Sequence, residues 1–237
     1  MHILIQMFQM FDNAVINLIF TSAHSAVYSR IASYLSFSTV KFLPIVLVIC
    51  WYWSKKTPQQ ALNRQILVEA VFSSLLAIFV GRLLALTLPF RERPFLNPEL
   101  NTNFSDPQML RTWSSFPSDH AVLSFALAAS LFRISPTIGI LAFLHASILI
   151  CLPRVVLGWH YPSDIIGGAI VGILIVIISA KIKAREKLVK FILGIESKSA
   201  EIFYVFAFIL LYEIIEMFDS IRGIVAKTFA LLQHIAA

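Results

Sequence analysis

The tripeptide Pro-Ser-Asp occurs twice in this chain, each time beside a histidine. Residues 117–119 run directly into His120, and residues 162–164 begin two positions after His160. Histidine can exchange a proton near neutral pH or attack an electrophile such as phosphorus, and a nearby carboxylate can orient it. The repeat is therefore the strongest indication of function in the sequence.

Arginines accompany both histidines. Arg154 precedes His160 by six residues, and Arg91 and Arg93 belong to an Arg-Glu-Arg-Pro run at 91–94. Guanidinium groups pair with phosphate oxygens, and helix N-termini offer free backbone N–H groups to the same oxygens. A cluster of arginines, histidines and a carboxylate beside helix N-termini would therefore suit phosphate chemistry.

The stretch between the two histidines determines whether they can meet. Residues 123–132 and 138–152 are apolar and are joined by a turn at Ser135 and Pro136. With their flanks, the two runs are long enough for two antiparallel helices of roughly 27 Å each, at about 1.5 Å per residue. An out-and-back path of this kind would return both histidines to one membrane face.

Composition predicts that these helices lie in a membrane. Hydrophobic residues make up 58% of the 237 residues, charged residues only 14%, and the mean hydropathy is +0.81. Such values are typical of a polytopic membrane protein rather than a soluble domain. The predicted fold class is an all-α integral membrane bundle of about six transmembrane helices. The expected spans cover residues 40–53, 68–88, 121–132, 138–152, 165–180 and 202–217.

The N-terminal segment is a less clear span. Residues 3–20 are apolar but carry Gln6, Gln9, Asp12 and Asn13. This pattern favours an amphipathic helix lying in the membrane interface, with a true span as the alternative. The segment lacks the charged region and cleavage site of a secretory signal, so we expect it to stay on the mature protein.

Basic residues predict the orientation of the bundle. One face carries ten of them: Lys55, Lys56, Arg64, Arg133, Lys181, Lys183, Arg185, Lys187, Lys190 and Lys198. By the positive-inside rule this face is cytoplasmic, so the loops at 89–116 and 153–164 would face the periplasm or another extracytoplasmic space. The expected location is the bacterial inner (cytoplasmic) membrane. The net charge of +6 fits this orientation signal and does not indicate nucleic-acid binding.

Three short motifs resemble the signature of the type 2 phosphatidic acid phosphatase superfamily. They are Arg93-Pro94, the run 117–120, and Arg154 with His160 and Asp164. The wider strings at 115–121 and 158–162 are similar to those of the bacterial undecaprenyl-diphosphatase branch. The resemblance spans about residues 65–180. We therefore predict an N-terminal helix and connection at 1–38, a phosphatase core at 39–190, and a further span with an amphipathic tail at 191–237.

The resemblance implies a phosphohistidine mechanism that needs no metal and no cofactor. His160 would attack phosphorus, Asp164 would orient it, and His120 would protonate the leaving oxygen and then activate water. The phosphate oxygens would contact Arg93, Arg154, the Ser118 hydroxyl and backbone N–H groups around Asp119. The sequence also lacks the carboxylate cluster that a dinuclear metal phosphatase needs.

The chain departs from the family pattern at three positions. Leu86 stands where the family has a basic residue; Arg91 or Arg82 could substitute, and Arg91 is favoured because it lies outside the apolar run. Asp119 replaces the usual glycine, and we expect its side chain to point away or to cap the helix. Pro153 stands where a serine commonly precedes the arginine.

The substrate is expected to be a lipid phosphate whose tail stays in the bilayer. The branch resemblance favours undecaprenyl diphosphate, with recycling of the carrier lipid for cell-envelope polymers as the implied role. The alternatives are another lipid phosphate such as phosphatidic acid, phosphatidylglycerol phosphate or a lipid A phosphate, transfer to an acceptor lipid, and a transporter or scaffold without turnover. The expected partners are the substrate and membrane lipids, and the oligomeric state stays open.

Several other polar residues have structural interpretations. His145 is expected to form a hydrogen bond between helices. Arg82 and Glu69 lie too far apart on one apolar run to pair, so each should snorkel or meet another helix. Ser163 is expected to cap a helix, and Glu213 to face the interface.

Overall fold

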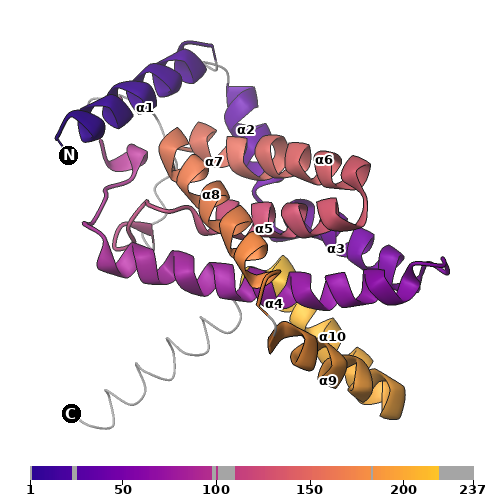
Figure 1. Ribbon diagram of the computed structural model, residues 1–237. Helices are drawn as coiled ribbons and strands as arrows, with labels where there is room; N and C mark the ends of the chain where they lie inside the picture. The colour runs from indigo at the N-terminus through magenta and orange to yellow at the C-terminus, as the bar shows by residue number, and fades with distance from the viewer. Residues whose placement is uncertain (1, 23–25, 98–99, 101–109, 183, 219–237) are drawn as a thin grey trace, which may run out of the picture.

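The computed structural model describes the chain except for residues 1, 23–25, 98–99, 101–109, 183 and 219–237. Its described residues form helices joined by short connections, with no strand among them (Figure 1). The helices are α1 His2–Ser22, α2 Ala26–Leu35, α3 Ser38–Ser54, α4 Gln60–Thr87, η1 Pro94–Leu96, α5 Asp119–Ile134, α6 Pro136–His145, η4 Ala146–Cys151, α7 Leu152–Val156, α8 Pro162–Ser179, α9 Ala184–Lys198 and α10 Ala200–Ile215. The predicted all-α class is confirmed.

Among the described residues, three helical stretches are long and apolar enough to cross a membrane. They are Gln60–Thr87, Pro136–Val156 and Pro162–Ser179. Helices α3, α5 and α10 are shorter, with 17, 16 and 16 residues. All six expected spans fall on helices, and the chain is a membrane protein. The count of about six membrane-crossing helices stays a prediction.

Helix α5 lies at the centre of the bundle, packed against α4, α6 and α8. Two glycines of α8 bring that helix onto the first turns of α5. A Cβ at Gly168 would lie 2.7 Å from the Ser118 carbonyl oxygen, and one at Gly172 would lie 2.4 Å from the Val122 carbonyl oxygen. Glycines allow such close backbone approach in membrane bundles, so they place the N-termini of α5 and α8 side by side.

The helix that follows α5 changes its hydrogen-bonding pattern before Arg154. Six residues, Ala146–Cys151, form a π-helical segment between α6 and α7. Pro153 lacks a backbone N–H, and its ring clashes with the carbonyl four residues earlier, so an ordinary α-helical ladder cannot run through it. The π-helical segment ends just before Pro153, and α7 resumes around the proline with Arg154 buried.

Helices at both ends of the chain extend this core. Helix α1 lies against α7 and α8 (Figure 1). Asp12 of this helix is buried. The position of α1 in the membrane interface stays a prediction. Helix α10 packs against α3 and α9, and Glu213 near its end is buried, contrary to the expectation that it would face the interface.

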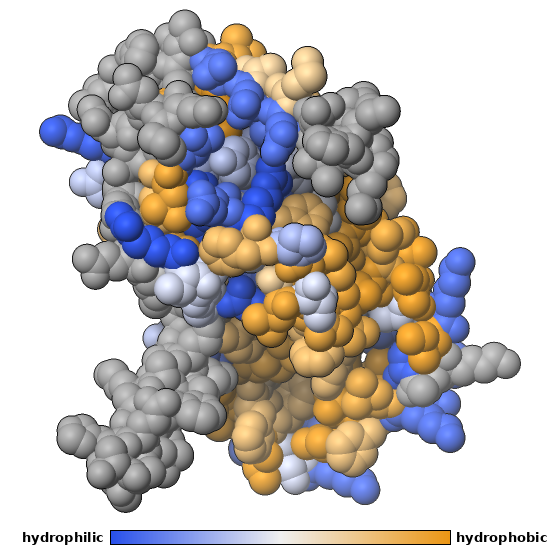
Figure 2. Space-filling view, turned by 90° about the vertical axis from the view of Figure 1, so that its left-hand side faces the viewer, coloured by the Kyte–Doolittle hydropathy of each residue, from blue (hydrophilic) through white to orange (hydrophobic). Residues whose placement is uncertain are grey.

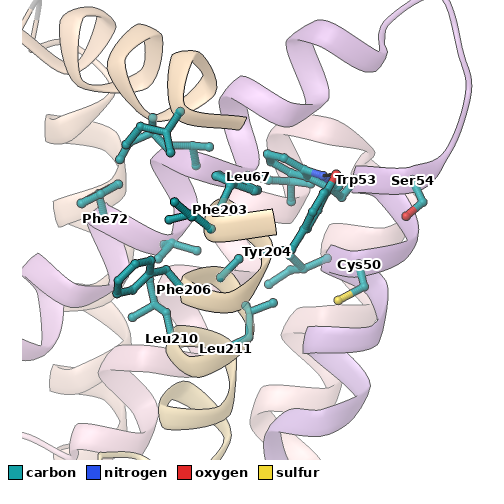
Figure 3. Close-up of a pocket in the computed structure, with 17 residues that line it drawn as sticks. Cys50, Trp53, Ser54, Leu67, Phe72, Phe203, Tyr204, Phe206, Leu210 and Leu211 are labelled. Atoms are coloured by element: carbon teal, nitrogen blue, oxygen red, sulfur yellow. Dashed lines mark hydrogen bonds between the residues drawn. The ribbon is translucent and has the colours of Figure 1, made fainter. Parts of the chain in front are cut away.

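An apolar cavity of about 560 Å³ lies between α3, α4, α9 and α10. Its wall includes Leu67, Phe72, Phe203, Phe206 and Leu211 (Figure 3). None of the described residues that line it is charged. The cavity therefore suits hydrocarbon, and phosphate chemistry must lie elsewhere in the molecule.

Candidate active site

A second, polar cavity of about 120 Å³ lies where α4 ends and where α5 and α8 begin. Figure 2 looks onto this end of the molecule, where hydrophilic side chains gather beside an apolar surface. The lining residues are Arg82, Arg93, Leu110, Trp113, Ser114, Pro117, Asp119, His120, Arg154, Trp159, His160 and Met217. The structure thus brings together both histidines and the two arginines of the family motifs.

His160 is held so that one ring nitrogen is available to the cavity. Its Nδ1 lies 2.9 Å from the Ser115 carbonyl oxygen, and its Nε2 lies 3.3 Å from a guanidinium nitrogen of Arg93. A carbonyl oxygen only accepts, so Nδ1 carries the hydrogen and Nε2 keeps its lone pair. Burial lowers the pKa of His160 below its ordinary value, which favours the neutral ring.

Asp164 orients His160 mainly through Ser115. The nearest carboxylate oxygen lies 3.6 Å from His160 Nδ1, longer than a hydrogen bond and unlike the direct contact that we expected. That oxygen accepts hydrogen bonds from the Ser115 hydroxyl and, at 2.7 Å, from the Tyr161 backbone N–H. The carboxylate therefore fixes Ser115, and the Ser115 carbonyl fixes the ring.

Arg93 is anchored by backbone carbonyl groups. It donates to the carbonyl oxygens of Trp159 at 2.7 Å and of Leu110 and Trp113 at 3.2 Å. Burial lowers its pKa from 12.5 to about 10, so the side chain still carries its charge at neutral pH. A cation fixed in this way is preorganised for an anion beside His160.

Arg154 completes the charge around His160. Its side chain is 1% exposed and donates to the Ser36 hydroxyl at 3.1 Å, and its guanidinium lies 5.2 Å from the centre of the Trp159 ring. The buried indole N–H of Trp159 has no hydrogen-bond partner among the described residues. A donor of this kind in the wall of the cavity suits a site that receives an anion.

The structure places Arg91 and Arg82 differently from our expectation. Arg91 does not line the cavity: it pairs with Asp12 and Asp164, both at 2.5 Å. Arg82 does line it, with its guanidinium 4.0 Å from the centre of the Trp113 ring. Arg82 lies one helical turn before Leu86, so α4 still presents a basic side chain to the site.

Two expected contacts at the start of α5 also differ. The Asp119 side chain neither points away nor caps the helix; it lines the cavity, 3.2 Å from Arg82. The Ser118 side chain is fully buried and outside the lining, and its hydroxyl has no hydrogen-bond partner among the described residues. A contact between this hydroxyl and phosphate stays a prediction.

The remaining polar residues mostly find partners on other helices. His145 Nε2 lies 2.7 Å from the Lys41 carbonyl oxygen, as expected for an interhelical histidine. Glu69 pairs with Arg133 and Arg185, each at 2.7 Å. Ser163 bonds to Asp12 and Arg91 rather than capping α8. In the described part of the chain, no group of three or more histidine, cysteine or carboxylate side chains could hold a metal ion.

Comparison with protein families matches residues 66–187 to the PAP2 superfamily. The chain belongs to the PAP2 superfamily. This confirms the resemblance carried by the three short motifs, all of which lie within the matched residues. The predicted division of the chain into three parts stays a prediction.

Two curated relatives match similar shares of this PAP2 chain. The Bacillus licheniformis protein named bacitracin transport permease protein BcrC is 30% identical over 134 residues, which cover 56% of this chain and 61% of the relative. The Escherichia coli (strain K12) protein named putative undecaprenyl-diphosphatase YbjG is 26% identical over 146 residues, covering 61% and 68%. The chain therefore spans about three fifths of the first relative's length.

One solved structure is also similar, the first transmembrane PAP2-type phosphatidylglycerolphosphate phosphatase from Bacillus subtilis. The match covers 73% of this chain and 92% of that one, with 19% identity and a TM-score of 0.36.

Several charged or cavity-lining side chains near the PAP2 site lie outside the family match. Asp12 comes from α1, Lys41 from α3 and Met217 from the end of α10. Sequence analysis had noted Asp12 only as a polar interruption and had not singled out Lys41. The signal available was a charged residue in an otherwise apolar segment, which often marks a function in membrane proteins.

Asp12 is expected to stabilise the PAP2 site through Arg91. Its carboxylate accepts the Ser163 N–H at 2.8 Å, the Ser163 hydroxyl at 2.6 Å and the Arg91 guanidinium at 2.5 Å. The change Asp12→Asn removes the charge from this buried group, and we expect it to lower the free energy of unfolding by about 1–3 kcal/mol. Denaturation of the purified protein in detergent would measure the loss. Asn13→Ala, at the exposed position next to Asp12, is the control. An equal loss of unfolding free energy in both variants would contradict the prediction.

Proposed function

We propose that this chain is a lipid phosphatase that hydrolyses undecaprenyl diphosphate to undecaprenyl phosphate and inorganic phosphate through a phosphohistidine on His160. The observation that carries the proposal is the geometry of His160. Its Nε2 keeps a lone pair in the cavity, beside a buried and anchored Arg93. A neutral nucleophile next to a fixed cation is what transfer of a phosphoryl group requires.

In the first step, His160 Nε2 attacks the terminal phosphorus in line. The N–P bond forms as the bond from phosphorus to the bridging oxygen breaks, and His120 donates its proton to that oxygen. Arg93 and Arg154 stabilise the charge that spreads over the equatorial oxygens. The Ser115 carbonyl accepts a hydrogen bond from Nδ1, so the ring stays aligned as it gains positive charge.

In the second step, water hydrolyses the phosphohistidine. His120, now neutral, takes a proton from the water as its oxygen attacks phosphorus. The N–P bond breaks, and its electron pair returns to His160 Nε2. The products are inorganic phosphate and an enzyme ready for the next substrate. Neither step uses a metal or a cofactor.

The cavity favours a substrate with more negative charge than a monoester. Three arginines line it: Arg82, Arg93 and Arg154. Two of them suffice to hold one phosphoryl group, and Arg82 is available for the second group of a diphosphate. The name of the Escherichia coli relative, putative undecaprenyl-diphosphatase, agrees with this choice.

The location proposed for the reaction is the extracytoplasmic face of the bacterial inner membrane. The basic residues of α9 lie at the end of α8 opposite to the site, because α8 begins at the cavity and leads into α9. By the positive-inside rule, that opposite end faces the cytoplasm. A lipid substrate would reach the cavity sideways from the bilayer.

The test is phosphate release by the purified protein, with EDTA present, from undecaprenyl diphosphate, phosphatidic acid and phosphatidylglycerol phosphate. We expect the diphosphate to have the highest kcat/KM, and Arg82→Gln to lower it by roughly 10-fold or more while affecting the monoesters less. Arg64→Gln, which removes an arginine paired with Glu196 outside the cavity, is the control. A preference for a monoester would replace the proposed substrate. No release from any of these lipids would contradict the proposed activity.

A further inference from the structure

Lys41 is a buried lysine in contact with His120. Its residue is 6% exposed, and its Nζ lies 3.2 Å from His120 Nε2. The next residue, Phe42, is fully buried, and its ring stacks on the imidazole at a centroid distance of 6.2 Å. The first turns of α3 are therefore packed directly against His120.

The position of this lysine needs an explanation. Lys41 lies in the first turn of α3, where the apolar part of that helix begins, and a lysine at such a place usually extends its ammonium group to the membrane surface. Here the side chain is buried instead, and burial of a charge is costly unless that charge has a partner. Contact with a proposed catalytic imidazole indicates a role in the reaction.

We propose that Lys41 is a positioning residue for His120: its ammonium group donates to Nε2 of the neutral ring and so holds it in place, and its charge makes the protonated imidazole a stronger acid toward the leaving oxygen. This inference rests on the proposed role of His120 as acid and base. The physical reason is that a neighbouring positive charge disfavours a second one, so the proton leaves His120 more readily. The proton goes to the bridging oxygen, as in the first step of the proposed mechanism.

Other charged groups face the same cavity and also contribute to the electrostatic potential at His120. They are Arg82 from α4, Asp119 from α5, Arg154 from α7, and Arg93 and His160 from the connections. Asp119 lies 3.2 Å from Arg82, and Arg93 lies 3.3 Å from His160. Glu213 of α10 is also buried at this end of the bundle. Lys41 contacts the imidazole of His120 itself, with Nζ 3.2 Å from Nε2.

The proposal predicts a defined change in the pH profile of kcat. The acidic limb reports deprotonation of His160, which must be neutral to attack, and the alkaline limb reports loss of the proton from His120. Replacing Lys41 by a neutral residue removes a positive charge beside His120 and raises the pKa of that histidine. The alkaline limb should therefore move to higher pH by about one unit, while the acidic limb stays in place.

Two neutral variants and one charged variant test this. Lys41→Met keeps the length of the side chain, Lys41→Gln keeps a donor without the charge, and Lys41→Arg keeps the charge. We expect the alkaline limb to move in both neutral variants and to stay near its original position in Lys41→Arg. If Lys41→Met does not fold, Lys41→Gln decides the question alone.

The outcomes separate this inference from the proposed function. If the neutral variants lose kcat at every pH without movement of the alkaline limb, Lys41 is only a structural residue and the inference is overturned. His120→Ala is measured in parallel, because it must abolish the alkaline limb. If that limb survives in His120→Ala, the proposed role of His120 fails, whatever the lysine variants show.

Discussion

Replacing His160 by alanine is expected to lower kcat by roughly 1,000-fold or more, with little effect on folding. The Nε2 atom would form the bond to phosphorus, and it lies 3.3 Å from a guanidinium nitrogen of Arg93. Phosphate release from undecaprenyl diphosphate measures the loss. Brief incubation with a substrate labelled in its terminal phosphate should also yield an acid-labile phosphoenzyme in the original protein and none in the variant.

The control for this change is a second histidine in the bundle. His145 lies outside the cavity and bonds to the Lys41 carbonyl oxygen, a contact that a glutamine amide can keep. His145→Gln should therefore form the phosphoenzyme at a rate close to the original one. Turnover by His160→Ala at the original rate would exclude the proposed nucleophile, and turnover without any phosphoenzyme would favour direct attack by water.

Replacing His120 by alanine is expected to have an effect that depends on the leaving group. With undecaprenyl diphosphate, kcat should fall roughly 100- to 10,000-fold, because the bridging oxygen loses its proton donor. An aryl phosphate such as p-nitrophenyl phosphate has a leaving oxygen that needs no proton, so its first step should remain fast. The second step still lacks a base to activate water. Rapid-mixing measurements should therefore show a burst of nitrophenol followed by slow turnover.

Ser124→Ala is the matched control on the same helix. Ser124 lies one turn after His120, and its hydroxyl donates to the His120 carbonyl oxygen at 2.7 Å without lining the cavity. This change should leave the kinetics of both substrates nearly unchanged. Equal losses of His120→Ala on both substrates, with no burst, would exclude His120 from the acid and base roles.

The two histidines differ in how the surrounding protein supports them. His160 is oriented by the Ser115 carbonyl, and the Ser115 hydroxyl donates to Asp164. Arg91 in turn pairs with both Asp164 and Asp12. His120 is contacted by the ammonium group of Lys41. Asp12 and Lys41 both come from helices that precede the residues matched to the family. The N-terminal helices therefore contribute charge to the site as well as bulk to the bundle.

Helix α10 contributes to the same end of the molecule from the other terminus. Met217 lines the cavity, and both Met217 and Phe218 have left-handed backbone conformations, with φ of 55° and 61°. Residues other than glycine rarely adopt this conformation, which ends helices by turning the chain away from the helix axis. The last described helix therefore ends at the cavity.

The class of the protein and the core of the site could be predicted from the sequence alone. Hydropathy is a local property, so the apolar runs predicted the membrane helices without knowledge of their packing. The motif residues are also close in sequence: Arg154, His160 and Asp164 lie within eleven positions, and a helix start fixes much of their relative placement. Such short-range patterns were sufficient to indicate the family and the two histidines.

Which charged side chains reach the site, and through which contacts, depends on the packing of helices that are distant in sequence. The sequence favoured Arg91 over Arg82, whereas Arg82 is the one that lines the cavity. The order depends on tertiary contacts, because Asp12 of α1 and Asp164 of α8 pair with Arg91, and Asp119 of α5 pairs with Arg82. Lys41 and His120 lie 79 positions apart, and Asp12 and Ser163 lie 151 apart. No local pattern predicts such pairs, because they form only when distant helices pack and a buried charge must find a partner.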